Sequence, residues 1–206
     1  IFLLAISRLG PFLLLFFIII GILYYININN FLGRFQKEIQ YEANHDPLTG
    51  ILNRRLADLY LKGIFRDFNR NGKSPAIVML DIDDFKKIND QWGHDIGDKV
   101  LQSLTKTIQS SLRSTDYLFR WGGEEFLLMY PNIEDDELES LGKRLNILIS
   151  SINIEFTHRD VPQSITITVS IGISKIRIVD SSPQDSIKRA DIALYMAKDA
   201  GKNCTR

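Results

Sequence analysis

Two groups of acidic side chains stand at positions where they could share one cation. Asp81, Asp83 and Asp84 follow a continuous apolar run, and Glu124 and Glu125 follow a pair of glycines between two other apolar runs. Acids at such places are most often solvated turn residues. If the two groups lie on neighbouring strands, however, their carboxylates converge and raise one another's pKa unless a cation neutralises them. Magnesium prefers such oxygen ligands together with substrate phosphates, so the pattern indicates phosphoryl-transfer chemistry.

The hydrophobic pattern predicts the elements that would position these acids. Strands are expected at residues 76–80, 117–121, 125–130 and 165–174, the second and third forming a hairpin around Gly122-Gly123. Helices are expected at about residues 53–69, 99–112, 135–151 and 185–200. This order predicts an α+β fold with a central sheet of the ferredoxin-like or polymerase-palm type, rich in antiparallel pairs and with helices on one face.

The N-terminal end carries nearly all of the hydrophobic excess. Residues 10–28 contain no ionisable acid or base, and they are long enough to cross a bilayer. Tyr24 and Tyr25 near the end of this run suit the membrane interface. A buried core helix or a signal peptide is the alternative, but the run is long for either and no small-residue cleavage site follows it. We therefore expect residues 1–28 to form a transmembrane segment, the end of a longer N-terminal region.

Residues 29–44 are expected to form a helical linker between this segment and a folded domain at residues 45–206. Leu32, Phe35 and Ile39 form one apolar stripe, with charged residues on the other faces. The spacing suits either a short parallel coiled coil or a plain connecting helix, and the sequence does not decide between them.

Composition limits the classes of function. The formal net charge of zero gives no basic field for a nucleic-acid partner, so none is expected. Cys204 is the single cysteine of the 206 residues, which rules out an internal disulfide and suits a reducing compartment.

A family resemblance appears at residues 120–126, where RWGGEEF is similar to the signature of the GGDEF family of diguanylate cyclases in its GGEEF form. Four more blocks resemble the family in order: DPLTGILNRR at 46–55, DIDDFKKINDQWGHDIGD at 81–98, TVSIGIS at 168–174 and ADIALYMAKDAGKN at 190–203. The five blocks cover nearly everything from His45 onward, whereas the signature alone would be weak evidence.

The resemblance implies that two GTP molecules are joined into cyclic di-GMP with release of pyrophosphate. It implies that Asp81, the backbone carbonyl of Ile82, Glu124 and Glu125 hold magnesium, or manganese in its place. Glu124 would also accept the proton of the attacking ribose 3′-hydroxyl. Positioning and charge neutralisation are what phosphoryl transfer requires, which agrees with this set. The alternative for Glu124 is a solvated acid beside the metal.

The same resemblance assigns nucleotide contacts. Asn89 and Asp98 would read the guanine edge, His94 would lie near the nucleotide, and the backbone amides of Phe85 and Lys86 would cradle phosphates at a helix start. The alternatives are a turn residue for Asn89, a helix N-cap for Asp98 and a structural role for His94.

Lys198 and Lys202 are implied as triphosphate-binding residues. They lie four residues apart near the end of the last expected helix, where they could share a face. The family usually has an arginine at the second position, and a lysine there keeps the charge but loses bidentate geometry. Solvated lysines favourable to a helix C-terminus are the alternative.

A regulatory site is implied just before the signature. Arg113 and Asp116 match the family's RxxD inhibitory site, which binds the cyclic di-GMP product, and Arg144 falls where some members supply a second arginine. Because the product has two identical halves, a homodimer is expected. The expected location is the inner membrane of a bacterium, with the catalytic domain in the cytoplasm. The rival functions are a catalytically silent cyclic di-GMP receptor, a cyclase for another purine dinucleotide, which Asp98 argues against, and a GTP-binding signalling module.

Overall fold

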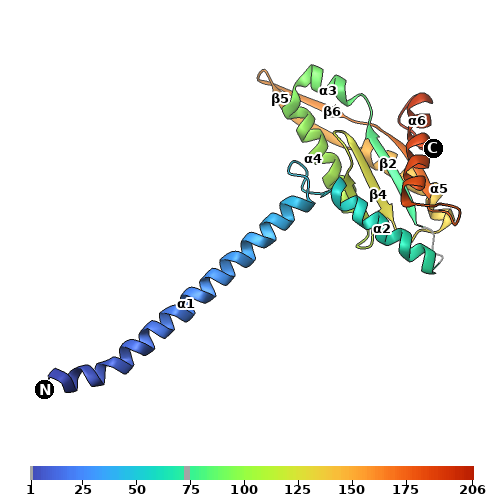
Figure 1. The fold of residues 1–206 in the computed structure, drawn as a ribbon. Helices are drawn as coiled ribbons and strands as arrows, with labels where there is room; N and C mark the ends of the chain where they lie inside the picture. The colour runs from blue at the N-terminus through green and yellow to red at the C-terminus, as the bar shows by residue number, and fades with distance from the viewer. Residues whose placement is uncertain (1, 72–74) are drawn as a thin grey trace. The chain divides into compact units, whose positions relative to one another are not determined.

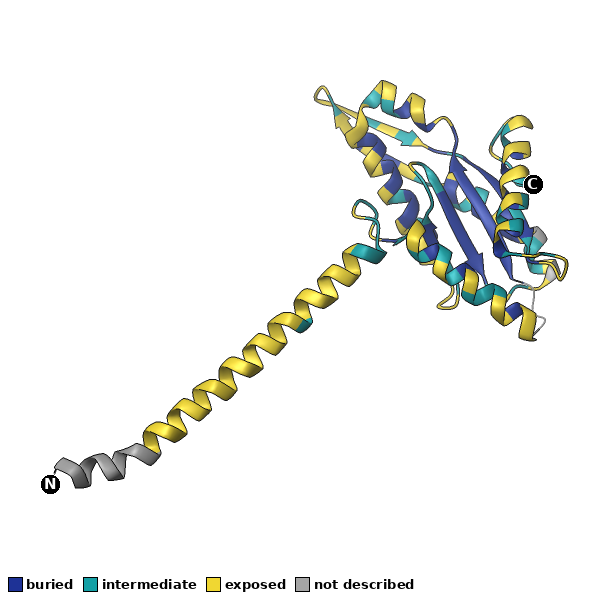
Figure 2. Cartoon of the chain, in the orientation of Figure 1, coloured by how far each residue is buried: buried dark blue, intermediate teal, exposed yellow. Residues whose placement is uncertain are grey.

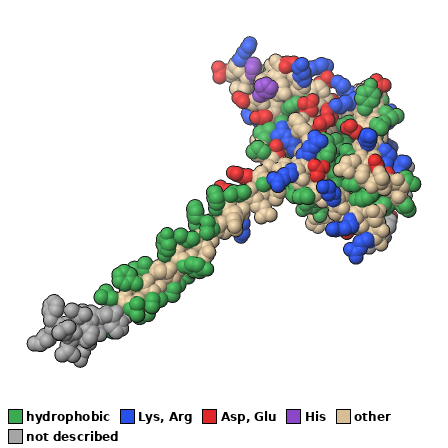
Figure 3. Space-filling view, viewed as in Figure 1, with side chains coloured by type: hydrophobic (Ala, Val, Ile, Leu, Met, Phe, Trp, Pro, Cys, Tyr) green, Lys and Arg blue, Asp and Glu red, His purple; other side chains and the backbone are tan. Residues whose placement is uncertain are grey.

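The computed structural model describes residues 2–71 and 75–206, in two compact units, Ile1–Ala43 and Asn44–Arg206. The first unit consists of helix α1 (Phe2–Asn44), so the segments predicted as membrane span and linker lie in one continuous helix. From Phe12 onward this helix is long and apolar enough to cross a membrane. Its described side chains are nearly all exposed, and hydrophobic side chains follow its length (Figures 2 and 3).

The second unit is an α+β domain whose elements follow one another in a mixed order. They are β1 (Leu52–Asn53), α2 (Arg54–Asn71), β2 (Ala76–Ile82), α3 (Phe85–Trp92), α4 (His94–Ser111), β3 (Tyr117–Arg120), β4 (Glu125–Tyr130), α5 (Asp135–Ser150), β5 (Asn153–His158), β6 (Val161–Thr166), β7 (Val169–Lys175) and α6 (Pro183–Asp199). Five strands form the main sheet in the order β1-β3-β4-β2-β7, and β5 and β6 form a separate hairpin (Figure 1).

Strand β2 lies between β4 and β7 and pairs antiparallel with both. β3 and β4 form the predicted hairpin, and β1 adds in parallel to β3. The mostly antiparallel sheet confirms the predicted fold class. The acidic end of β2 therefore lies beside the start of β4, where the signature glutamates stand.

Both faces of the sheet are covered, so the prediction of helices on one face was wrong. All seven residues of β2 are buried. Val78 and Leu80 pack into a core with α3, α4 and α5, whereas Ile77 and Met79 pack into a second core with α2 and α6. Successive side chains of a strand point to opposite faces, so an unbroken apolar run requires an apolar layer on each side.

Two features of the domain differ from the sequence expectation. The helix expected from residue 99 begins at His94, and it is preceded by α3, of which only the start at Phe85 and Lys86 was expected. Gly93 separates the two helices with a φ of 86°, a conformation open to glycine. The strand expected at residues 165–174 is two strands, because residues 165–166 belong to β6, which pairs with the unpredicted β5.

Gly172 brings β7 and α6 into close contact. A Cβ atom at this position would lie 2.0 Å from the carbonyl oxygen of Ala190 and 2.2 Å from the amide nitrogen of Leu194. Both of those atoms are backbone and cannot rotate away. The glycine therefore allows α6 to pack directly on the strand.

Candidate active site

The acidic strand end and the signature hairpin are adjacent. Asp81 of β2 pairs with Glu125 of β4, and the backbone N–H of Ile82 donates to the carbonyl oxygen of Glu124 at 3.4 Å. The two acidic groups therefore lie on neighbouring strands, and the strand register brings them together. Asp81 is only 5% exposed, and its burial raises its pKa, against the opposing hydrogen bond from Lys198.

The carboxylates at this edge of the sheet favour the binding of a positive charge. Burial first, and then the negative charge of Asp81, raise the pKa of Glu124 above its usual value. The ammonium of Lys198 lies 2.8 Å from Oδ2 of Asp81 and partly offsets this repulsion. Two carboxylates that repel each other beside one lysine favour the binding of a cation, or of a phosphate that brings a cation with it.

The expected metal ligands are Asp81, the carbonyl of Ile82, Glu124 and Glu125. Within residues 2–71 and 75–206, no group of three or more His, Cys, Asp or Glu side chains is placed to hold a metal ion. Asp81 and Glu124 lie close enough for their charges to interact, and the carbonyl of Ile82 belongs to the same strand end. These oxygens fit magnesium, which commonly takes one or two carboxylates and completes its shell with water and substrate phosphates.

The three aspartates after the apolar run have three different environments. Asp81 faces the signature hairpin. Asp83 is 7% exposed and accepts hydrogen bonds from Thr168, Ser170 and the backbone of residue 203. Asp84 is the N-cap of α3 with a φ of 56°, and it forms ion pairs with Lys87 and Lys202, which lower its pKa. Treating the three as one cluster was therefore too coarse.

Arg120 holds the loop that carries the signature glutamates. Its guanidinium donates to the carbonyl oxygen of Gly123 at 2.8 Å and, at 3.3 Å, to that of Gly122. The opposite edge of the same group pairs with Asp46 at 2.9 Å. Sequence reasoning did not assign roles to these two residues; their opposite charges in two of the five similar blocks were the available signal.

The residues predicted to read guanine lie on two contacting helices. Asn89 is on α3, and its Oδ1 is buried with no hydrogen-bond partner among the described residues. The amide lies against Gly97, where a Cβ would come within 2.0 Å of Oδ1. Asp98 follows Gly97 and is exposed within α4, so its alternative as a helix N-cap does not apply. His94 is the exposed first residue of α4.

The phosphate-binding predictions fall at the ends of α3 and α6. Helix α3 begins at Phe85, so the amides of Phe85 and Lys86 belong to a first turn, whose N–H groups have no acceptor within the helix. The side chain of Phe85 is buried in the core, whereas Lys86 is exposed. Lys202 does not share a helix face with Lys198, because α6 ends at Asp199 and Lys202 lies beyond it with a φ of 66°.

The three predicted inhibitory residues line one cavity of about 360 Å³. Arg113 and Asp116 reach it from the loop after α4, and Arg144 reaches it from α5; Tyr130 and Glu137 line it as well. Asp116 accepts a hydrogen bond from the backbone N–H of Arg113 at 3.0 Å. The guanidinium of Arg113 is already paired with Glu137 at 2.7 Å. Burial raises the pKa of Tyr130, so its hydroxyl is a hydrogen-bond donor at neutral pH.

The sheet, with carboxylates at the end of β2 and the glycine hairpin of β3 and β4 beside them, places this domain in the α+β class. Residues 43–204 match the family model described as "Diguanylate cyclase, GGDEF domain". The chain belongs to this family.

Similar proteins come from bacteria. DgcC of Escherichia coli (strain K12), a probable diguanylate cyclase, is 32% identical over 174 residues, covering 84% of this chain and 46% of DgcC. The diguanylate cyclase DgcM of the same organism is 34% identical over 177 residues, covering 82% of this chain and 40% of DgcM. The crystal structure of the coiled coil and GGDEF domain of DgcB from Caulobacter crescentus, in complex with c-di-GMP, matches with a TM-score of 0.80 at 27% identity; it covers 86% of this chain and 92% of that one. The chain spans less than half the length of the two curated relatives.

Proposed function

We propose that this chain condenses two molecules of GTP into cyclic di-GMP and pyrophosphate. The observation that carries the proposal is the register between β2 and β4, which sets Asp81 beside the signature glutamates with Lys198 at 2.8 Å. Similarity to curated diguanylate cyclases supports it, as does the cyclic di-GMP bound by the similar GGDEF domain of DgcB.

Each residue of the site has a proposed task. Asp81, the carbonyl of Ile82, Glu124 and Glu125 hold magnesium, with manganese as an alternative. When bound, the metal neutralises the carboxylates and the triphosphate. Glu124, whose raised pKa makes it a better proton acceptor than an ordinary glutamate, takes the proton of the attacking 3′-hydroxyl.

Substrate recognition is proposed to use both helices that follow β2. The unpaired Oδ1 of Asn89 accepts a hydrogen bond from guanine, and Asp98 accepts a second. His94 lies near the nucleotide. The first amides of α3, at Phe85 and Lys86, bind phosphate oxygens. Lys198 and Lys202 bind the rest of the triphosphate.

Product inhibition is proposed at the cavity of Arg113, Asp116 and Arg144. Two guanidinium groups can bind the product's phosphates, while the carboxylate binds a guanine edge. This site lies on the opposite face of the sheet from α6, since its walls are α4 and α5.

Assembly and location are also proposed. One GTP cannot supply both 3′–5′ linkages, so two catalytic domains must face each other across a two-fold axis. Residues 1–28 anchor the chain in the bacterial inner membrane, residues 29–44 join the anchors to the cytoplasmic domains, and residues 45–206 catalyse. A protein lacking the residues before His45 should then be a poor cyclase at low concentration, and full activity as a monomer would contradict this.

The decisive experiment incubates the purified full chain with GTP and magnesium and separates the products by chromatography. Cyclic di-GMP plus pyrophosphate is expected, and Glu124→Gln should abolish both. Glu155→Gln, which changes an exposed glutamate of β5, serves as the matched control and should keep full activity. Binding of cyclic di-GMP without any turnover of GTP would identify a silent receptor instead.

A further inference from the structure

The turn after α6 has a strained backbone that something must hold in place. Gly201, Lys202 and Asn203 have φ values of 106°, 66° and 45° in succession. A positive φ is easy for glycine and tolerated by asparagine, but it costs free energy for lysine. This turn carries the Lys202 ammonium, so the contacts that hold the turn also determine where that charge lies.

Asp83 provides the contact from the sheet. Its carboxylate accepts hydrogen bonds from the hydroxyls of Ser170 at 2.6 Å and Thr168 at 2.7 Å, and from the backbone N–H of Asn203 at 3.0 Å. The first two bonds fix the carboxylate against the start of β7. The third joins it to the turn, so one buried group links the acidic end of β2 to the residue next to Lys202.

The remaining contacts fix the turn from its other sides. The amide of Lys202 donates to the carbonyl oxygen of Ala197 at 3.1 Å, and its ammonium pairs with Asp84 at 2.7 Å. Beyond the turn, the carbonyl oxygen of Cys204 accepts from Ile171 of β7 at 3.0 Å.

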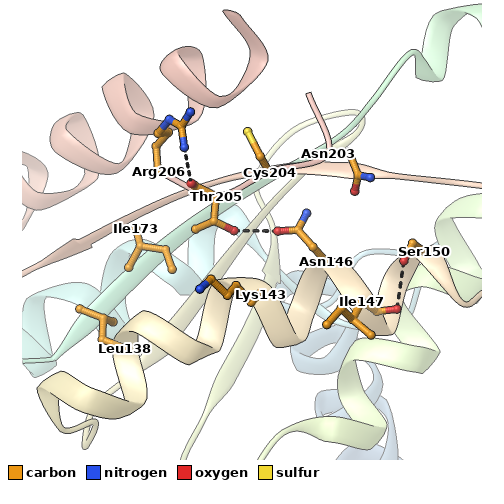
Figure 4. Close-up of a pocket in the computed structure, with 10 residues that line it drawn as sticks. All are labelled: Leu138, Lys143, Asn146, Ile147, Ser150, Ile173, Asn203, Cys204, Thr205 and Arg206. Atoms are coloured by element: carbon orange, nitrogen blue, oxygen red, sulfur yellow. Dashed lines mark hydrogen bonds between the residues drawn. The ribbon is translucent and has the colours of Figure 1, made fainter. Parts of the chain in front are cut away.

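Residue 205 anchors the same segment to α5. The hydroxyl of Thr205 donates to Oδ1 of Asn146 at 2.7 Å, along a cavity of about 730 Å³ (Figure 4). Lys202 thus lies between an anchored helix end and an anchored C-terminal segment, with Asp83 between them.

We propose that Asp83 is a positioning residue for the triphosphate: it touches no substrate itself and holds Lys202 where the phosphates of GTP bind. This inference rests on the proposed function, because it gives the lysine a ligand. Phosphate recognition by a flexible ammonium depends on the side chain's starting position, since a lysine has no planar geometry to orient it. Loss of Asp83 should therefore weaken binding in proportion to the number of phosphates.

The test compares Asp83→Asn with the unchanged full chain in detergent with magnesium, by calorimetric titration of guanosine, GDP and GTP. The dissociation constant of GTP should rise about tenfold, as expected when a hydrogen-bonded charge is misplaced, while that of guanosine stays unchanged. In turnover, KM for GTP should rise more than kcat falls. An equal loss for all three ligands would overturn the proposal.

The chain offers a matched control at the other end of α6. The side chain of Asp180 is 2% exposed and accepts hydrogen bonds from Arg189 at 2.7 Å and the backbone N–H of Arg177 at 2.8 Å. Asp180→Asn removes a comparable buried carboxylate and should reduce thermal stability without the phosphate-dependent pattern. The same pattern in this control would mean that general loosening, not positioning, is the cause.

A double-mutant cycle tests the route through Lys202. In a Lys202→Met background, Asp83→Asn should add little further loss of GTP affinity, whereas additive losses would contradict the proposal. Should Asp83→Asn prove too unstable, Ser170→Ala removes one of its donors, and the same pattern is expected with smaller size. Absence of GTP binding by the unchanged chain would sink the proposed function as well, whereas turnover without a phosphate-dependent defect would sink only this inference.

Discussion

The guanidinium of Arg120 and the carboxylate of Asp46 form a two-pronged contact across 74 residues of sequence, with Nη1 at 2.9 and 3.0 Å from the two carboxylate oxygens. Both side chains are largely buried, at 17% and 14% exposed. Although burial raises the pKa of Asp46, hydrogen bonds from Thr49 and Arg120 outweigh it and hold that pKa below its usual value. Asp46 therefore stays ionised at neutral pH and fixes the arginine that binds the signature loop.

Arg120→Lys should separate these two contacts. A lysine keeps the charge but cannot reach Asp46 and the Gly123 carbonyl at once. We expect cyclic di-GMP formation to fall about tenfold or more, as for the loss of a charged hydrogen bond. Asp46→Asn leaves the bonds to the loop carbonyls and should cost less activity. Initial rates measured with unfolding midpoints check this, and a larger loss in Asp46→Asn would count against it.

Glu124→Gln should stabilise the metal-free chain at neutral pH. The pKa of Glu124 is raised in the folded state, so its contribution to stability is present below about pH 4 and is lost as pH rises through the raised pKa. Removing the charge should raise the unfolding midpoint by about 1–3 °C at pH 7, with no difference at about pH 4. Calorimetry with a chelator tests this. Exposed Glu155→Gln is the control, and a lower midpoint at pH 7 would refute the expectation.

Glu137→Gln should make the chain more sensitive to its product. Glu137 competes with the product's phosphates for Arg113, which it contacts at 2.7 Å. Because the pair is solvent-exposed, the gain should be modest, about a twofold to fivefold fall in the half-inhibitory concentration of cyclic di-GMP. Dose–response curves of GTP turnover measure it. Glu134→Gln, at the exposed start of the same helix, should leave the curve unchanged; a weaker inhibition in Glu137→Gln would show that the glutamate assists binding instead.

Gly97→Ala should impair guanine recognition. The new methyl group would lie 2.0 Å from Oδ1 of Asn89 and 3.3 Å from the ring of Phe85, so the amide must rotate out of its place. KM for GTP should rise about five- to tenfold, in line with the loss of one hydrogen bond to the base. Gly63→Ala in α2 is the matched control, since a Cβ there meets nothing within 4 Å. Unchanged KM in Gly97→Ala would argue that Asn89 does not read the base.

Much of the fold was predictable because its signals are local. The apolar run of β2, the glycine turn that joins β3 to β4 and the helical periodicity of α2 and α5 each lie within a short stretch of consecutive residues. The extent of α3 did not follow from periodicity, because the helix has only eight residues between an acidic turn and Gly93; its start at Phe85 was expected from the family resemblance alone. The β5–β6 hairpin was missed because Arg159 and Asp160 form its tip with φ values of 50° and 61°, where glycine or asparagine would be the usual signal.

The candidate site was predictable only in part, because most of its contacts are not local in sequence. The proximity of Asp81 to the signature glutamates was predicted by assuming that their two strands are neighbours. The bonds of Asp83 to the backbone of Asn203, of Asp84 to Lys202 and of Asp46 to Arg120 join segments 74 to 120 residues apart. Such pairs depend on side-chain direction in the folded domain, and no local pattern encodes it.

Gly172 fixes the distance between β7 and α6, the helix that carries Lys198. Lys198 stands on α6, and α6 rests on β7 through backbone atoms alone at this glycine. Two backbones in contact cannot move closer or repack, unlike a pair of side chains. The distance over which the Lys198 ammonium reaches toward the end of β2 is therefore set by the length of the lysine side chain. A substitution at residue 198 would therefore change the length of the side chain without changing the distance between α6 and β7.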